Sequence, residues 1–222
     1  MYLNVLGQFL PGAMAIALSP FPVVAVVVLL TGRSARTAGP AFAAGWTIGL
    51  SLLSALVVWL SSGAEDSYSA QWVSATRIAI GAGLLVLAVK KWVGRPRGDE
   101  EPVMPGWMAV MDTAGPSQAF GIGLALGGVN PKHVAITSSA ASIIGEAHLV
   151  GGQAVTASVV FVLLSSFSVL GSVAFFFVGG DRSQGPLGSL RRFMVANTDV
   201  LIVAVLLMIG VNILGDGISG LG

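Results

Sequence analysis

The sequence contains no cysteine and very few charged residues. The absence of cysteine excludes disulfides, thiolate metal ligands and thiol redox chemistry. Only 9% of the 222 residues are Asp, Glu, Lys or Arg, whereas about a quarter of an ordinary soluble domain is charged. The chain therefore has too little charge to cover a water-facing surface. This shortage excludes a soluble enzyme, a nucleic-acid-binding protein and a disordered chain.

Apolar residues, which make up 55% of the sequence, are arranged in long runs. Neither Met1–Gly32 nor Thr37–Ala64 contains a charged residue, and a helix needs about 20 apolar residues to cross a bilayer. Such segments are predicted at 6–30, 38–60, 72–92, 118–144, 149–177 and 199–214. The short alternating strands of a membrane β-barrel are absent. We predict an all-α integral membrane protein with six transmembrane helices.

Basic residues are concentrated in the loops after the first, third and fifth predicted helices. These loops contain Arg33, Arg36, Lys90, Lys91, Arg95, Arg97, Arg182, Arg191 and Arg192. The opposite side has only Arg77. Because basic loops stay on the cytoplasmic side, we expect a multi-pass membrane protein with both termini outside.

A polar stretch at 94–102 divides the chain into two halves of three predicted helices each. An odd number of helices per half makes the halves enter the membrane in opposite directions, which is typical of inverted-repeat transporters. We predict a first repeat at 1–93, a cytoplasmic linker at 94–117 and a second repeat at 118–222. Segments 107–112 and 187–195 are candidate interfacial helices, or simple connecting loops.

The first helix of each half contains a proline-rich interruption near its centre. Pro20 and Pro22 follow Ser19 in the first half, and Pro131 follows Gly127 and Gly128 in the second. Proline removes a helical hydrogen bond, and a break in the membrane survives only where it faces protein or a wet cavity. Two matching breaks predict a substrate site between the halves. The alternative is that both simply kink structural helices.

Lys132 lies next to the second break, roughly 13 residues from either end of its predicted segment. A charge at this depth costs several kcal/mol unless it is paired, neutral or hydrated. We interpret Lys132 as the counter-charge for an anionic group, with Asn130 as a donor and acceptor beside it. The alternative is a salt bridge to a buried acid, but no predicted helix has an acid at mid-depth. His133 is either a proton relay or a neutral side chain bonded to a backbone carbonyl.

Small residues recur every four positions at Ala41, Gly45 and Gly49, and again at Gly123 and Gly127. Such faces let helices approach closely, either within one chain or in a homodimer. No nucleophile elbow, phosphate-binding loop or His-Glu-x-x-His sequence is present. We therefore expect neither an enzyme nor a cofactor, and no metal site.

Three sequence motifs are similar to those of a known family. Ala17–Pro22, Trp107–Met108 and Asn130–Lys132 resemble the GAP family, the glycopeptidolipid- and sulfolipid-addressing proteins of the lysine-exporter superfamily. The resemblance extends over nearly the whole chain. It implies a location in the bacterial cytoplasmic membrane and transport of cell-envelope glycolipids across it, often beside a larger lipid exporter. The family motifs that carry over to this chain comprise Ser19, Pro20, Pro22, Asn130, Pro131 and Lys132.

The leading hypothesis is a transporter that moves an anionic glycolipid or lipid-linked sugar, with Lys132 at the headgroup. The expected substrate-binding residues are Ser19, Pro20, Pro22, Asn130, Pro131, Lys132 and His133. A second hypothesis is an exporter of amino acids or ions, and a third is a non-transporting subunit of a lipid-export complex. A lipid site should open sideways and be partly apolar, whereas a solute site should be polar and closed to lipid.

Overall fold

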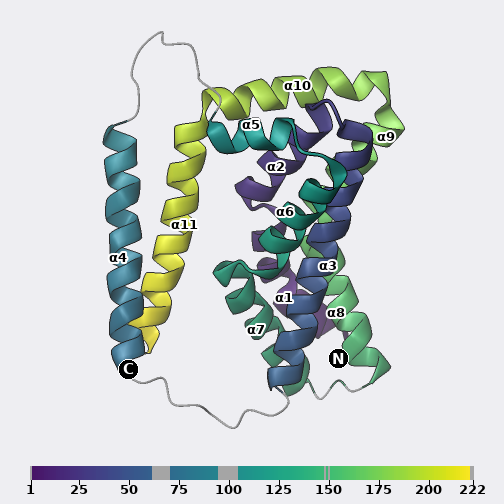
Figure 1. The fold of residues 1–222 in the computed structure, drawn as a ribbon. Helices are drawn as coiled ribbons and strands as arrows, with labels where there is room; N and C mark the ends of the chain where they lie inside the picture. The colour runs from purple at the N-terminus through teal and green to yellow at the C-terminus, as the bar shows by residue number, and fades with distance from the viewer. Residues whose placement is uncertain (1, 62–70, 95–104, 148, 150, 221–222) are drawn as a thin grey trace. The chain divides into compact units, whose positions relative to one another are not determined.

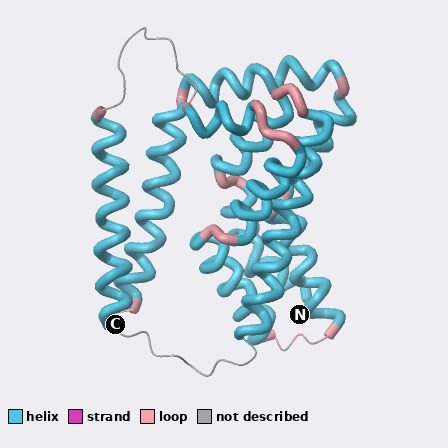
Figure 2. The backbone as a smooth tube through the Cα atoms, in the orientation of Figure 1, coloured by secondary structure: helices cyan, strands magenta, loops and turns pink. Residues whose placement is uncertain are grey.

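The computed structural model describes residues 2–61, 71–94, 105–147, 149 and 151–220, and every regular element in these ranges is an α-helix (Figure 1, Figure 2). Contacts divide the chain into two compact units. The first unit comprises Met1–Ala64 and Gly106–Arg191, and the second comprises Glu65–Pro105 and Arg192–Gly222. Each unit contains pieces of both predicted repeats, so the repeat boundaries at 93 and 118 are not packing boundaries; they stay a prediction.

The helices follow the predicted segments closely. They are α1 (Tyr2–Ala17), α2 (Pro20–Thr31), α3 (Ala35–Ser61), α4 (Gln71–Val93), α5 (Gly106–Asp112), α6 (Pro116–Gly128), α7 (Pro131–Glu146), α8 (Gly152–Ser165), α9 (Phe167–Gly179), α10 (Asp181–Ala196) and α11 (Thr198–Ser219). The predicted segments at 6–30, 118–144 and 149–177 each form two shorter helices. Residues 95–104 of the predicted linker and His148 lie outside the described residues.

Several described helices are suited to cross a membrane. Ala35–Trp59 and Thr198–Ser219 are long and apolar enough by themselves. The pairs α1–α2 and α8–α9 also qualify when each is taken as one bent span. By length and composition, the described residues thus contain two to four spans, which supports a membrane protein.

The first unit is built on a very close crossing of α3 and α6. A side-chain carbon on Gly45 would collide with the carbonyl oxygen of Phe120, and one on Gly127 would collide with that of Trp46. Gly49 and Gly123 are equally crowded by backbone atoms of the opposite helix. The predicted small-residue faces therefore pack against each other within the chain, because only glycine lets two backbones approach so closely.

The second unit consists mainly of α4 packed along α11. Glycines again set the contact: a side-chain carbon on Gly81 would lie 2.6 Å from the backbone nitrogen of Leu214. Neither helix is broken. Lys91, in the last turn of α4, forms an ion pair of 2.8 Å with Asp199, in the first turn of α11. Both charges lie at the helix ends that the helix dipole favours.

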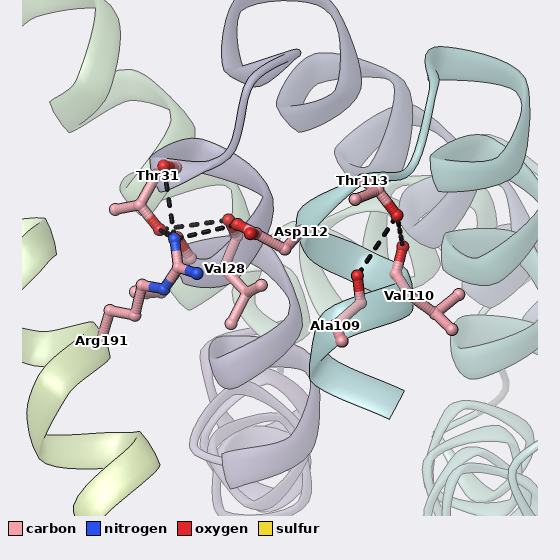
Figure 3. Close-up of polar contacts among 8 residues, drawn as sticks. Val28, Thr31, Ala109, Val110, Asp112, Thr113 and Arg191 are labelled. Atoms are coloured by element: carbon pink, nitrogen blue, oxygen red, sulfur yellow. Dashed lines mark hydrogen bonds and ion pairs between the residues drawn. The ribbon is translucent and has the colours of Figure 1, made fainter. Parts of the chain in front are cut away.

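Two helices, the seven-residue α5 and the more polar α10, cover one end of the first unit (Figure 1). The ring of Trp107 in α5 stacks on that of Phe21 in α2, with centroids 4.8 Å apart. Arg191 of α10 forms an ion pair of 2.9 Å with Asp112 and contacts the carbonyl and hydroxyl oxygens of Thr31 (Figure 3). Segments 107–112 and 187–195 are thus helices and not simple loops.

Candidate functional site

The first break separates α1 from α2 by two residues and bends the chain by 51°. Pro20 occupies the first turn of α2, where its missing N–H is not needed and its fixed φ suits a helix. Ser19 precedes it in an extended conformation and makes no side-chain capping bond. The proline motif therefore starts a new helix instead of kinking a continuous one.

The second break lies between α6 and α7. Asn130 adjoins the start of α7 at Pro131, and its side-chain oxygen accepts a 3.0 Å hydrogen bond from the backbone N–H of Lys132. This is the geometry of an N-cap, which satisfies one of the unpaired donors at a helix start. The side chain of Asn130 thus has a local structural role that the sequence analysis did not consider.

A third break, between α8 and α9, was not predicted. The chain bends by 62° at Ser166, which lies between helices ending at Ser165 and beginning at Phe167. Both serines are fully buried, and neither hydroxyl has a hydrogen-bond partner among the described residues. Serine hydroxyls compete with helical hydrogen bonds, so the Ser165-Ser166-x-Ser168 cluster is the signal that marks this position.

The three breaks meet at the C-terminal end of α1. The ammonium of Lys132 donates a 2.8 Å hydrogen bond to the carbonyl oxygen of Ala15. The hydroxyl of Ser168, at the start of α9, donates to the carbonyl oxygen of Ala17. The last carbonyls of a helix have no partners within it and carry partial negative charge. The end of α1 therefore holds the starts of α7 and α9 in place.

Lys132 has no acidic partner in the described part of the chain. The ion pairs of Lys91 with Asp199 and of Arg191 with Asp112 do not involve it. The helices α1, α2, α6, α8 and α9 contain no charged residue at all. An ammonium has three donor hydrogens, and one of them binds Ala15. Lys132 is partly buried and keeps donors for another group.

His133 points into the first unit beside Trp46 and is fully buried. Its Nδ1 lies 3.1 Å from the carbonyl oxygen of Gly127; a carbonyl only accepts, so Nδ1 is the donor. The ring meets Trp46 edge-on, with centroids 5.2 Å apart. One expectation for His133, a bond to a backbone carbonyl, is met by Nδ1, whereas Nε2 has no partner among the described residues.

Further polar atoms next to His133 are also buried and unpaired. Trp46 Nε1 and Thr137 Oγ1 have no hydrogen-bond partner within the described residues, and Thr137 is one helical turn from His133. An unpaired buried polar group costs about 1–3 kcal/mol, so such groups are expected to meet water or a ligand. Sequence reasoning missed Trp46. The signal was a tryptophan well inside the predicted segment at 38–60, since tryptophan in a span usually lies at a membrane surface.

The residues expected to bind substrate occupy the first two breaks. Lys132 and His133 lie in the first turn of α7, Asn130 caps it, and Ser19 and Pro22 are buried at the start of α2. The hydrogen bond from Lys132 to Ala15 brings the two breaks together. No group of three potential His, Cys, Asp or Glu metal ligands is found among the described residues.

A family model described as Sap, sulfolipid-1-addressing protein, matches residues 9–219. The chain belongs to this family. Neither the curated proteins nor the solved structures contain a significant match. The matched range includes all three breaks and the helices α5 and α10. The features that form the candidate site therefore lie in the part of the chain that matches the family.

Proposed function

We propose that this family member is a transporter that moves an anionic glycolipid or lipid-linked sugar across the cytoplasmic membrane for cell-envelope assembly. The observation that carries the proposal is the ammonium of Lys132, held by the carbonyl of Ala15 where three helix breaks meet and facing no acidic side chain in the described residues. An intramembrane charge that faces no opposite charge in the protein points to a charged cargo. The family description, which names a sulfolipid, agrees with an anionic headgroup.

The polar atoms beside Lys132 favour a headgroup that also carries hydroxyls. His133 Nε2 is an acceptor, because Nδ1 donates to Gly127. Trp46 Nε1 is a donor, and Thr137 Oγ1 is both. All are buried without partners in the part of the chain described. A sugar presents donors and acceptors together, so it would satisfy these atoms.

The helix pairings support the inverted repeat. The second helix of the first half, α3, packs on the first span of the second half, α6–α7. Conversely, α1–α2 packs on α8–α9, which is the second span of the second half. The third helices, α4 and α11, pack on each other. Exchanging the halves reproduces the same pairings, as an inverted repeat requires. Six spans follow if α4 and the pair α6–α7 also cross the membrane.

Removing the charge of Lys132 tests the proposal. Lys132→Gln keeps a donor for Ala15 but removes the charge, so the fold should survive. In liposomes with the purified protein, we expect roughly a hundredfold slower movement of a fluorescent sulfated glycolipid. Lys132→Arg should retain much of the rate, and Lys90→Gln, which neutralises an exposed lysine at the end of α4, should behave as the wild type.

Three outcomes would overturn the proposal. An unchanged rate in Lys132→Gln would exclude the headgroup role. Movement of amino acids or ions, but not lipid, would identify a small-solute exporter. A wild-type protein that moves neither, but associates with a larger lipid exporter, would be a non-transporting subunit. An unsulfated glycolipid provides the matched substrate control, because its movement should not depend on the charge of Lys132.

A further inference from the structure

A groove of about 610 Å³ lies between α3 and α8 in the first unit. It extends along α3 from Thr47 to Trp59 and along α8 from Ala154 to Leu163. The two helices lie side by side (Figure 1). Much of the wall is open to the surroundings, since Val155 is 63% exposed and Trp59 is 71% exposed. The groove therefore opens sideways, in the direction from which membrane lipid approaches.

The walls of the groove are apolar and carry no charge. Its lining includes Val155, Val159 and Leu163 from α8. Hydroxyl groups also line it, but those of Thr47 and Ser51 donate to carbonyls of their own helix at 2.8 and 2.7 Å. The same holds for Ser158, which donates to Ala154 at 3.0 Å. Of the four lining hydroxyls, only that of Ser54 has no hydrogen-bond partner among the described residues. Because the other three donors are already used, the surface fits hydrocarbon better than a polar solute.

The length of the groove matches one leaflet of a bilayer. Thr47 and Trp59 are twelve residues apart, which corresponds to about 18 Å along a helix. Half of a hydrocarbon core is about 15 Å thick. Tryptophan favours the level of the headgroups, so Trp59 is suited to the outer limit of the leaflet. An acyl chain that follows the groove would thus extend from the membrane surface to its centre.

The inner end of the groove lies close to the candidate site. Thr47 follows Trp46, whose ring contacts His133, the neighbour of Lys132. On the other wall, Val162 follows Phe161, whose ring meets Phe9 of α1 edge-on with centroids 5.6 Å apart. Thr47 lies near the middle of α3, and Leu163 lies near the break that ends α8. The inner end of the groove therefore lies next to residues that pack against the candidate site and against α1.

We propose that the groove between α3 and α8 binds the hydrocarbon tail of the anionic lipid whose headgroup lies at Lys132. This inference rests on the proposed function and adds the location of the tail. Lipid tails are as apolar as the side chains here, so the hydrophobic effect does not drive this binding. Shape complementarity drives the binding instead, because a tail that fits the groove gains dispersion contacts with its walls that an unfilled groove lacks. The protein then needs a polar site only for the headgroup.

Filling the groove with a bulky side chain tests the proposal. Ala55 lines the groove and is exposed, whereas the adjacent Leu56 is 51% exposed but is not among the lining residues. Ala55→Trp should fill the groove without disturbing the core, and Leu56→Trp is the matched control. The probe is a sulfated glycolipid with a photoactivatable diazirine in its acyl chain, and cross-linked residues are mapped by mass spectrometry.

In the wild type, cross-links should concentrate on groove residues and saturate with lipid concentration. Excess unlabelled sulfated lipid should compete, while an uncharged lipid with the same tail should not. Ala55→Trp should lower groove labelling and the translocation rate about tenfold, as expected when a fitted apolar contact is lost. Leu56→Trp should change neither. Lys132→Gln should raise the lipid concentration at which groove labelling saturates, without changing which residues are labelled.

The outcomes separate this inference from the proposed function. In one outcome, Lys132→Gln stops translocation, Ala55→Trp does not, and groove labelling does not saturate. The groove would then hold only bulk lipid, and this inference would fail while the proposed function stands. Equal competition by the uncharged lipid also overturns it. If the wild type moves no lipid but shows saturable labelling that Ala55→Trp removes, the groove site stands and the transport function falls. A Val155→Cys variant that forms a disulfide dimer would assign the groove to a second copy, against the proposal.

Discussion

The two units of the chain use the same packing rule but differ in helix continuity. In both, glycines let two helix backbones touch, at Gly45 and Gly127 in the first unit and at Gly81 in the second. The helices of the second unit, α4 and α11, run unbroken for 23 and 22 residues. Three of the segments in the first unit are instead divided near their centres. Close packing is therefore common to both units, whereas helix breaks near the centres of apolar segments are found in the first unit.

The physical reason is the location of unpaired polar groups. An unbroken helix satisfies its backbone internally and leaves free N–H and C=O groups only at its ends. In the second unit, the ion pair of Lys91 with Asp199 lies at such ends. In the first unit, the breaks place helix ends near the centres of apolar segments, where Lys132 and Ser168 bind the carbonyls of Ala15 and Ala17. The comparison can be tested with three further substitutions.

The largest effect is expected for Gly45→Ala at the crossing of α3 and α6. The added methyl group would collide with the carbonyl oxygen of Phe120, and backbone atoms cannot move aside cheaply. We expect a loss of about 3 kcal/mol in stability, measured as unfolding in detergent micelles. Gly121→Ala on α6 is the control, since nothing lies within 4 Å of its added carbon. It should stabilise α6 slightly, by at most about 1 kcal/mol. Equal effects would contradict the crossing.

A smaller effect is expected for Arg191→Met. The substitution removes the ion pair with Asp112 and the contacts with Thr31 at the end of α2 (Figure 3). Because both charged side chains are partly buried, with 21% and 32% exposure, we expect a loss of about 1–2 kcal/mol. Thermal unfolding in detergent measures it. Arg182→Met, at the exposed start of the same helix, should cost less than about 0.5 kcal/mol. No difference between the two variants would show that the ion pair does not fasten α10.

The smallest effect is expected for Lys91→Met in the second unit. Its ion pair with Asp199 is more exposed, so we expect a loss of no more than about 1 kcal/mol. Salt should reduce the loss, because exposed charges are screened. Lys90→Met is the matched control on the adjacent residue. Unfolding measured at low and high salt should therefore separate the variants only at low salt. A loss larger than that of Arg191→Met would reverse the proposed ranking of the two ion pairs.

Much of the local structure could be predicted from the sequence. Long apolar runs identified the helical segments, and the prolines at 20 and 131 identified the positions where α2 and α7 begin. These are local signals: a proline fits the start of a helix whatever surrounds it. The short helices α5 and α10 were also found as candidates. The break at Ser166 was not predicted because it contains neither proline nor glycine.

The candidate site was only half predictable. The depth of Lys132 followed from its position between two ends of an apolar segment, and the shortage of acids followed from composition. Its partner, the carbonyl of Ala15, has no sequence signature because every residue has a carbonyl. The role of Asn130 as a helix cap and the contact of Trp46 with His133 were likewise hidden. Such contacts depend on which helix ends and faces meet.

The sequence by itself determined that this chain is a membrane protein, where its helices run and that a lone lysine lies near the middle of one segment. These properties depend on transfer of side chains from water to hydrocarbon, which adds up residue by residue along the chain. Only the tertiary structure decided that the small-residue faces close on each other, that three breaks converge on one helix end and that a groove opens between α3 and α8. Those features arise from contacts between residues far apart in sequence, which composition and periodicity do not encode.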